Sequence, residues 1–286
     1  VVNRMFANSL ASKVVKDYPK IRDVFAAWRN DEDALKSPLY QNEDLKTALL
    51  EETPWVMEAN SESLQRERIA LLFDLDRLAN EMAVAQRKLL DRQSPNGAFS
   101  WFPGGPEQWY MTQYVVEQLS HLRQLTGEEM NYELRNALEN AMRYCDQQVY
   151  KWYIELGEEQ KKDKEYSASP RIIHYLYTRN LNLDVELLPE QMEMYEYCWS
   201  RVTEHWLEAN LYEQAMIGLA AKYSSRDELA NKIYASLQER SLSSDELGRY
   251  WKQSYGFYWY QNNVETHVKL TELFAAMNAD EETLSE

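Results

Sequence analysis

A loop-and-helix unit occurs twice in this chain, and the repeat constrains the fold more than any other feature. The first copy, GAFSWFPGGPEQWYMTQYVVEQLSHL, covers residues 97–122, and a degraded second copy, YGFYWYQNNVETHVKLTEL, covers residues 255–273. The matched positions are Phe99, Trp101, Phe102, Thr112 and Leu119 in the first copy and Phe257, Trp259, Tyr260, Thr266 and Leu273 in the second. A unit that recurs within one chain is typical of stacked helical repeats, because a single unit cannot bury its apolar face alone.

Composition supports the same fold class. The 286 residues include only 8 Gly and 8 Pro, well below the usual shares of roughly 7% and 5%. Sandwiches and barrels need many tight turns, so this shortage favours helices joined by short polar connections. We expect an all-α fold of about ten to twelve helices that form hairpin-like pairs. The repeated aromatic loops suggest that the helices close into an α/α toroid, as a single domain over residues 1–286.

Apolar residues at helical spacing locate the expected helices. The expected helices cover residues 1–16, 21–28, 45–50, 61–91, 110–125, 170–181, 189–209, 211–223 and 263–277. A further helix carries the apolar stripe Leu134, Leu138, Ala141, Cys145, Val149 and Trp152. Capping-box patterns at residues 126–129, 225–228 and 243–246 predict three helix starts. Turn residues predict loops at 94–106 and 157–169.

Charge excludes some classes of partner. The chain has 31 basic and 47 acidic residues, a formal net charge of −16. Nucleic-acid binding depends on clustered Lys and Arg, so we expect no nucleic-acid partner. No apolar run approaches the roughly 18 residues that span a bilayer, so we expect no direct membrane insertion. Cys145 and Cys198 are too few for a disulfide framework, and the sequence leaves open whether they pair with each other or stay free.

The sequence shows no pattern that indicates an enzyme. Among its four histidines, His121 lies four residues after Glu117, a spacing that more often gives a helix-surface ion pair than a metal site. We therefore predict no metal, no other cofactor and no catalytic residue. Paired carboxylates in a toroid could still hydrolyse a polysaccharide. Candidates for that alternative are Glu107, Glu213 and Glu265.

Cys145 and Gln148 have the spacing of a side-chain thioester. Cys145 nevertheless lies on the apolar stripe of a helix, where a small buried hydrophobe is expected. The Glu that usually precedes the Gln of such a motif is missing. The pattern therefore favours a core cysteine.

Four segments together resemble one family. VNRMFANSLAS at the start resembles the helix that follows the thioester motif of bacterial α2-macroglobulin-like proteins, and residues 49–74 resemble the stretch before their first repeat. Residues 96–122 and 250–274 are similar to two of the family's repeats. The resemblance is closest to the large versions found in gut and oral Bacteroidetes. It implies an α/α-toroid, thioester-type domain that starts just after the C-x-E-Q motif and is incomplete at both ends.

The resemblance also implies a function. Members of the family are endopeptidase inhibitors that trap a protease covalently after it cleaves a bait segment. The implied partners are target proteases and neighbouring macroglobulin β-sandwich domains of the same chain, and the implied location is periplasmic or outer-membrane-attached. The aromatic residues that would shield the thioester or contact a neighbouring domain are Trp101, Phe102, Trp109, Tyr110, Tyr258, Trp259 and Tyr260. Two alternatives remain, namely rings that only pack the toroid end and a thioester-less relative that acts sterically.

Overall fold

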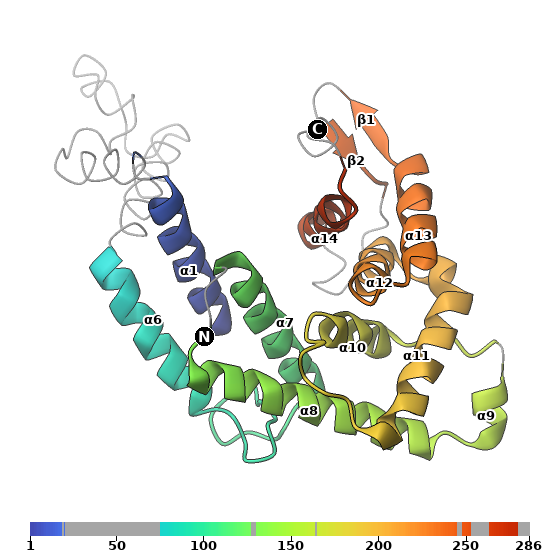
Figure 1. Ribbon diagram of the computed structural model, residues 1–286, viewed down its shortest axis with the longest axis horizontal. Coiled ribbons are helices and arrows are strands. Elements are labelled where there is room, and N and C mark those ends of the chain that lie inside the picture. The colour runs from blue at the N-terminus through green and yellow to red at the C-terminus, as the bar shows by residue number, and fades with distance from the viewer. Residues whose placement is uncertain are drawn as a thin grey trace, which may run out of the picture. The chain divides into compact units, whose positions relative to one another are not determined.

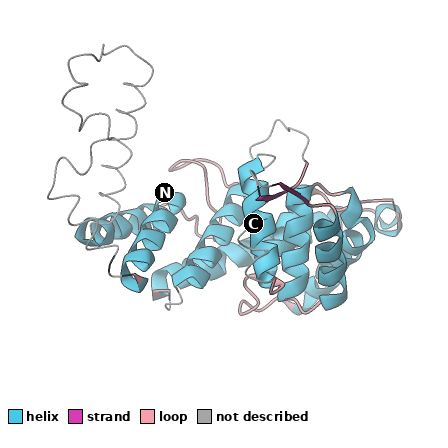
Figure 2. Cartoon of the chain, turned by 90° about the horizontal axis from the view of Figure 1, so that it is seen from above, coloured by secondary structure: helices cyan, strands magenta, loops and turns pink. Residues whose placement is uncertain are grey.

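The described chain is almost entirely helical. The computed structural model describes residues 1–18, 20, 75–126, 130–163, 165–244, 248–252 and 263–279. Figure 2 shows helices making up most of these residues, with one small pair of strands. The expectation of an all-α fold is confirmed. Closure into a toroid stays a prediction.

Figure 1 shows the described helices in chain order. The α-helices are α1 Val2–Asp17, α6 Leu75–Leu90, α7 Trp109–Thr126, α8 Tyr132–Glu155, α9 Glu158–Lys162, α10 Pro170–Asn180, α11 Met192–His205, α12 Leu211–Tyr223, α13 Asp227–Glu239 and α14 Asn263–Ala276. Two 3₁₀ turns, η1 Pro189–Gln191 and η2 Trp206–Glu208, flank α11. Strands β1 Leu242–Ser244 and β2 Gly248–Tyr250 form an antiparallel pair.

The chain divides into two compact units. One comprises Val1–Arg92 and His121–Leu134, and the other Gln93–Ser120 and Arg135–Glu286. That the whole chain is one domain stays a prediction. In the first unit, α1 packs along α6, with Met5 and Leu89 buried. The amide of Asn8 donates to the carboxylate of Glu81 at 3.4 Å across the two helices.

The core of the second unit is built around α12. This helix packs against α10, α13 and α14, and every residue from Glu213 to Ala221 is buried. A helix that is buried on all sides must meet neighbours all round, which explains its central place. At Gly218, an added Cβ would lie 2.9 Å from the Leu273 side chain of α14. The glycine therefore lets α12 and α14 approach closely.

Most expected helix bounds agree with the structure, and α13 begins at Asp227, within the helix start predicted at 225–228. The helix starts predicted at 126–129 and 243–246 are wrong. Helix α8 begins at Tyr132, where Asn131 Oδ1 accepts from the Leu134 amide at 3.0 Å, and not at 126–129. Ser225 has a φ of 58° and does not cap α13. Residues 242–244 form β1, so a helix starting in 243–246 was wrong. The loop expected at 157–169 contains the short helix α9. Expected helices at 21–28 and 45–50 lie outside the described residues.

Candidate functional site

Hydrogen bonds to α7 and α8 fix the position of the aromatic loop that precedes α7. The amide of Phe99 donates to Thr112 Oγ1 at 2.9 Å, and Gln93 Nε2 donates to the Ala137 carbonyl at 2.7 Å. Gly97 has a φ of 91°, and a Cβ there would lie 2.2 Å from the Asn140 carbonyl oxygen. Only glycine fits both the conformation and the close approach. The loop is therefore held in one place against α7 and α8.

Two of the predicted site residues on this loop, Trp101 and Phe102, are exposed to solvent. Trp101 is 57% exposed and Phe102 is 60% exposed. Trp109 and Tyr110 are half-buried at the start of α7. The ring of Trp101 stacks on Tyr110 with centroids 6.4 Å apart. Tyr258, Trp259 and Tyr260 lie outside the described residues.

The helical halves of the two repeats have the same burial. Thr112 and Leu119 on α7 are buried, and so are their counterparts Thr266 and Leu273 on α14. Matching burial at matching positions supports the predicted repeat in its helical part. The loop of the second copy lies outside the described residues.

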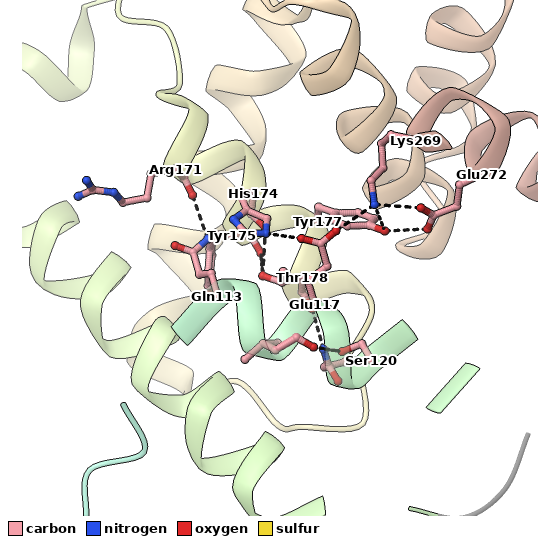
Figure 3. A network of polar contacts seen from close by, with 12 residues as sticks. Gln113, Glu117, Ser120, Arg171, His174, Tyr175, Tyr177, Thr178, Lys269 and Glu272 are labelled. Carbon is pink, nitrogen blue, oxygen red and sulfur yellow. Dashed lines mark hydrogen bonds and ion pairs between the residues drawn. The ribbon is translucent and has the colours of Figure 1, made fainter. Parts of the chain in front are cut away.

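A buried ionic network joins α7, α10 and α14 (Figure 3). Glu117 of α7 is 6% exposed and Lys269 of α14 is 5% exposed. Lys269 Nζ lies 3.0 Å from Glu117 Oε1, and His174 Nε2 of α10 lies 2.8 Å from Glu117 Oε2. The Glu117 carboxylate therefore bridges a cation and an imidazole within the core.

The same lysine reaches a second carboxylate. Lys269 Nζ lies 3.0 Å from Glu272 Oε2 and donates to the Tyr177 hydroxyl at 2.9 Å. That hydroxyl donates in turn to Glu272 Oε1 at 2.7 Å. Burial lowers the pKa of Lys269, but Glu117 and Glu272 outweigh it and hold the pKa above its usual value. The ammonium thus stays charged while buried. We call Glu117, His174, Tyr177, Lys269 and Glu272 the Glu117 cluster.

A pocket of about 480 Å³ opens beside the Glu117 cluster. Its walls come from three helices of the second unit. The lining residues used below are Tyr110, Tyr114 and Glu117 from α7, His174 from α10, and Tyr212 and Met216 from α12. Tyr110, Tyr114 and Glu117 share one face of α7 because they are four and three residues apart. The volume lies within the range of small-molecule sites.

The electrostatic field in the pocket is negative. Burial raises the pKa of the Tyr212 hydroxyl well above its usual value, and the charge of Glu117 raises it further. Glu272 and Glu265 act on this hydroxyl in the same direction. A phenol resists ionisation when carboxylates surround it, so the pocket disfavours additional negative charge.

Glu213 is the one glycosidase candidate that lines the pocket. The Glu213 carboxylate accepts from the backbone N–H of Asn210 at 3.1 Å. The backbone N–H of Glu213 donates to Asn210 Oδ1 at 2.9 Å. These two reciprocal hydrogen bonds cap α12. Burial raises the pKa of Glu213 despite these contacts. Glu107 is exposed and accepts from Asn96 at 2.9 Å. Glu265 is half-buried at the start of α14.

A second buried cluster lies between α8 and α10. Asp146 Oδ1 accepts from the Tyr175 hydroxyl at 2.7 Å and lies 3.3 Å from Arg179 Nε. Arg179 also donates to the carbonyls of Asn182 and Val185 just after α10. Burial raises the pKa of Asp146 to about 6, although Arg179 and the Tyr175 hydroxyl oppose the shift. We call Asp146, Tyr175 and Arg179 the Asp146 cluster.

The two cysteines are free and buried. Burial raises the pKa of the Cys145 thiol well above its usual value, with Asp146 contributing. Cys145 is part of the apolar stripe of α8, with Leu138, Ala141 and Val149. A core role for Cys145 is confirmed by its full burial on this stripe. That it forms no thioester with Gln148 stays a prediction.

The ionic network was not foreseen from the sequence. Glu117 was expected on a helix surface, which is wrong because it is buried. His174 and Lys269 lie 57 and 152 residues along the chain from it. The one local signal was Lys269 itself, a charged residue directly before Leu270 on the apolar face of α14. Among the described residues, no group of three or more His, Cys, Asp or Glu is arranged to hold a metal ion.

No protein-family profile matches the chain, and no curated protein matches it. Within the described ranges, no helix has the length and apolar character needed to cross a membrane.

Proposed function

We propose that the chain is the helical domain of an α2-macroglobulin-like endopeptidase inhibitor. The four sequence segments that resemble the family are the basis of this proposal. On this account, the domain shields and presents a thioester that lies before Val1 in the longer polypeptide. The inhibitor would act in the periplasm or at the outer membrane, against proteases that cleave its bait segment.

One structural observation supports a presenting role. Contacts of Thr112, Gln93 and Gly97 fix the loop of the first repeat. The side chains of Trp101 and Phe102 on this loop are nevertheless more than half exposed. Exposed rings on a fixed loop lose little conformational freedom on binding, and they are typical of interface anchors. Such rings suit contact with a thioester segment or with a neighbouring β-sandwich domain.

The chemistry of capture follows from the thioester. The amine nitrogen of a lysine on the protease attacks the thioester carbonyl carbon, and the carbon–sulfur bond breaks. An amide forms, and the sulfur leaves as a thiol that takes up the amine proton. Water would consume the bond by the same route, so shielding before bait cleavage is required.

Thiol titration of the full polypeptide tests the proposal. Methylamine replaces the lysine amine as a small nucleophile, and free thiols are counted before and after its addition. Cys145 and Cys198 are buried, so they react only after unfolding and serve as an internal count. One new thiol per chain in the native protein, with the mass gain of one methylamine, is the expected result. No new thiol would overturn the covalent trap and leave the thioester-less, steric inhibitor.

A second candidate is a carbohydrate-active toroid. The pocket favours it, because tyrosine rings stack on sugars and two carboxylates, Glu117 and Glu213, lie in its wall. Both carboxylates already accept hydrogen bonds from the protein. Hydrolysis of a polysaccharide that is abolished by Glu213→Gln would establish this function, whereas no hydrolysis by the native chain would remove it.

A further inference from the structure

The pocket beside the Glu117 cluster has features that no part of the proposed trap uses. Its lining combines three tyrosine side chains, Tyr110, Tyr114 and Tyr212, with the methionine Met216. Tyrosine faces carry negative charge from their π electrons and attract cations within about 6 Å of the ring centre. The thioether of Met216 adds a soft apolar wall. Such a lining suits a ligand that is both apolar and positively charged.

Charge in the wall favours a cation as well. Glu117 and Glu272 both lie 3.0 Å from the ammonium of Lys269, so two carboxylates meet one lysine beside the pocket. Glu213 is the second carboxylate of the pocket wall, after Glu117. Carboxylates in a partly buried site act over several ångströms because the surroundings screen them weakly.

The one arginine in the described lining is directed elsewhere. The guanidinium of Arg171 lies 4.9 Å from the ring centre of Trp109. In Figure 3 its side chain extends away from His174 and Glu117. The guanidinium therefore lies over the face of another ring and does not place its charge next to Glu117.

The number of N–H groups on a cation decides how well it suits this pocket. Glu117 already accepts from Lys269 and lies within hydrogen-bond distance of His174, while Glu213 is used in the helix cap. A primary amine has to place each of its N–H groups on an acceptor, in competition with the hydrogen bonds that these carboxylates already accept. A quaternary ammonium has no N–H to satisfy. It requires only negative potential and ring faces.

We propose that this pocket binds a quaternary ammonium group, such as a trimethylammonium head. The same chemistry occurs in free choline and in a trimethylated lysine side chain. The rings of Tyr110, Tyr114 and Tyr212 contact the methyl groups, and Glu117 and Glu213 supply the negative field. The inference depends on the pocket alone and holds whether or not the polypeptide carries a thioester.

Calorimetric titration of the native chain tests this first with a matched pair of ligands. Choline carries the charge, and 3,3-dimethylbutan-1-ol has the same shape with carbon in place of nitrogen. We expect choline to bind at least about tenfold more tightly than the neutral alcohol. Equal binding of the two, or no heat with choline up to about 10 mM, would overturn the proposal. A peptide with trimethyl-lysine, run in parallel, identifies the source that binds more tightly.

A series of variants then tests whether choline binds in this pocket. Tyr110→Leu removes a half-exposed ring and is expected to weaken choline binding about three- to tenfold, whereas Tyr110→Phe keeps the ring and the affinity. Tyr166→Leu, a half-buried tyrosine outside the pocket lining, is the matched control and should leave binding unchanged. An equal loss in the Leu and Phe variants would overturn the role of the ring. Binding of glucose but not of choline would overturn the proposal and favour the carbohydrate-active alternative.

Discussion

Two buried ionic clusters lie on opposite sides of α10, and they differ in what lies next to them. The Asp146 cluster is closed, because Arg179 uses its remaining N–H groups on the carbonyls of Asn182 and Val185. Its role is to fix the end of α10 against α8. The Glu117 cluster instead forms part of a pocket wall. Burial of charge alone therefore does not mark a functional site, and the adjoining cavity is the distinguishing feature.

The two clusters also differ in how they offset the free-energy cost of removing charged groups from water. In the Asp146 cluster the carboxyl's pKa rises to about 6, so burial partly overcomes the single arginine. In the Glu117 cluster two carboxylates hold the pKa of Lys269 above its usual value. The first cluster can relieve its charge by taking up a proton near neutral pH. The second keeps its ions charged, and it should therefore be harmed more by loss of one member.

The largest expected effect is that of Lys269→Met. Removal of the ammonium leaves the buried Glu117 and the half-buried Glu272 without this cation, which costs about 3–5 kcal/mol of unfolding free energy. Urea unfolding followed by circular dichroism measures it. Lys232→Met removes an exposed ion pair with Glu228 and is the control, with no measurable change expected. Similar losses in the two variants would contradict the distinction between buried and exposed pairs.

Next in size is the pH dependence that Asp146 confers. The pKa of its carboxyl is about 6 in the folded chain against an unperturbed 3.8. The folded state holds this proton more tightly, so the group's contribution to stability is complete below about pH 4 and is lost as the pH rises through about 6. Asp146→Asn has no proton to lose. Its stability relative to the wild type should rise by up to about 3 kcal/mol between about pH 4 and 7.

Unfolding curves at several pH values measure this difference. Asp227→Asn, an exposed carboxylate at the start of α13, is the control and should not reproduce the trend. A difference between Asp146→Asn and wild type that does not change with pH would show that Asp146 keeps an ordinary pKa.

A smaller effect is expected at the aromatic loop before α7. Gly97→Ala places a Cβ against the Asn140 backbone at a φ of 91°, and should cost about 2 kcal/mol. Gly104→Ala has a φ of 72° but no atom within 4 Å of the new Cβ, so only conformational strain remains, about 1 kcal/mol. Thermal unfolding of both variants tests the order. A larger loss at Gly104 would contradict the account of how the loop is fixed.

The smallest effect on stability is expected for Trp101→Ala. Trp101 is 57% exposed, and loss of its stack on Tyr110 should change the unfolding free energy by less than about 1 kcal/mol. Its effect on function should be greater, seen as faster loss of the thioester to water in the full polypeptide. Trp251→Ala, which removes a half-buried ring on Phe274, is the contrast and should cost more stability. Equal stability losses would contradict an outward, presenting role for Trp101.

Local patterns in the sequence were sufficient for most helices of the described chain. The expected helix at 211–223 coincides with α12, and that at 110–125 differs from α7 by one residue at each end. The bounds of α12 follow from a run of residues that is buried on all sides and not from a single apolar stripe. Two of the three capping patterns did not mark a helix start, because Ser and Asp side chains stabilise turns as readily as helix starts. At residues 243–246 the same residue types accompany a strand.

The candidate site could be predicted only in part. Trp101 and Tyr110 were named, and the structure stacks their rings on each other, with Tyr110 in the pocket lining. The sequence did not predict that Glu117, His174 and Lys269 contact one another. Their contacts depend on how α7, α10 and α14 pack, and no local pattern encodes that packing. Lys269 on an apolar face was a usable sign, since a buried lysine requires a partner. Which partner it finds could come only from the tertiary structure.

The most direct test of the pocket as the ligand-binding part of the chain is methionine-methyl NMR. Met216 lines the pocket, whereas Met142 is buried elsewhere in the second unit. Met216→Leu and Met142→Leu assign the two signals. On titration with choline, the Met216 methyl signal should shift with a saturating curve, and the Met142 signal should stay in place. A Met216 signal that does not move, or equal shifts of both signals, would contradict the account.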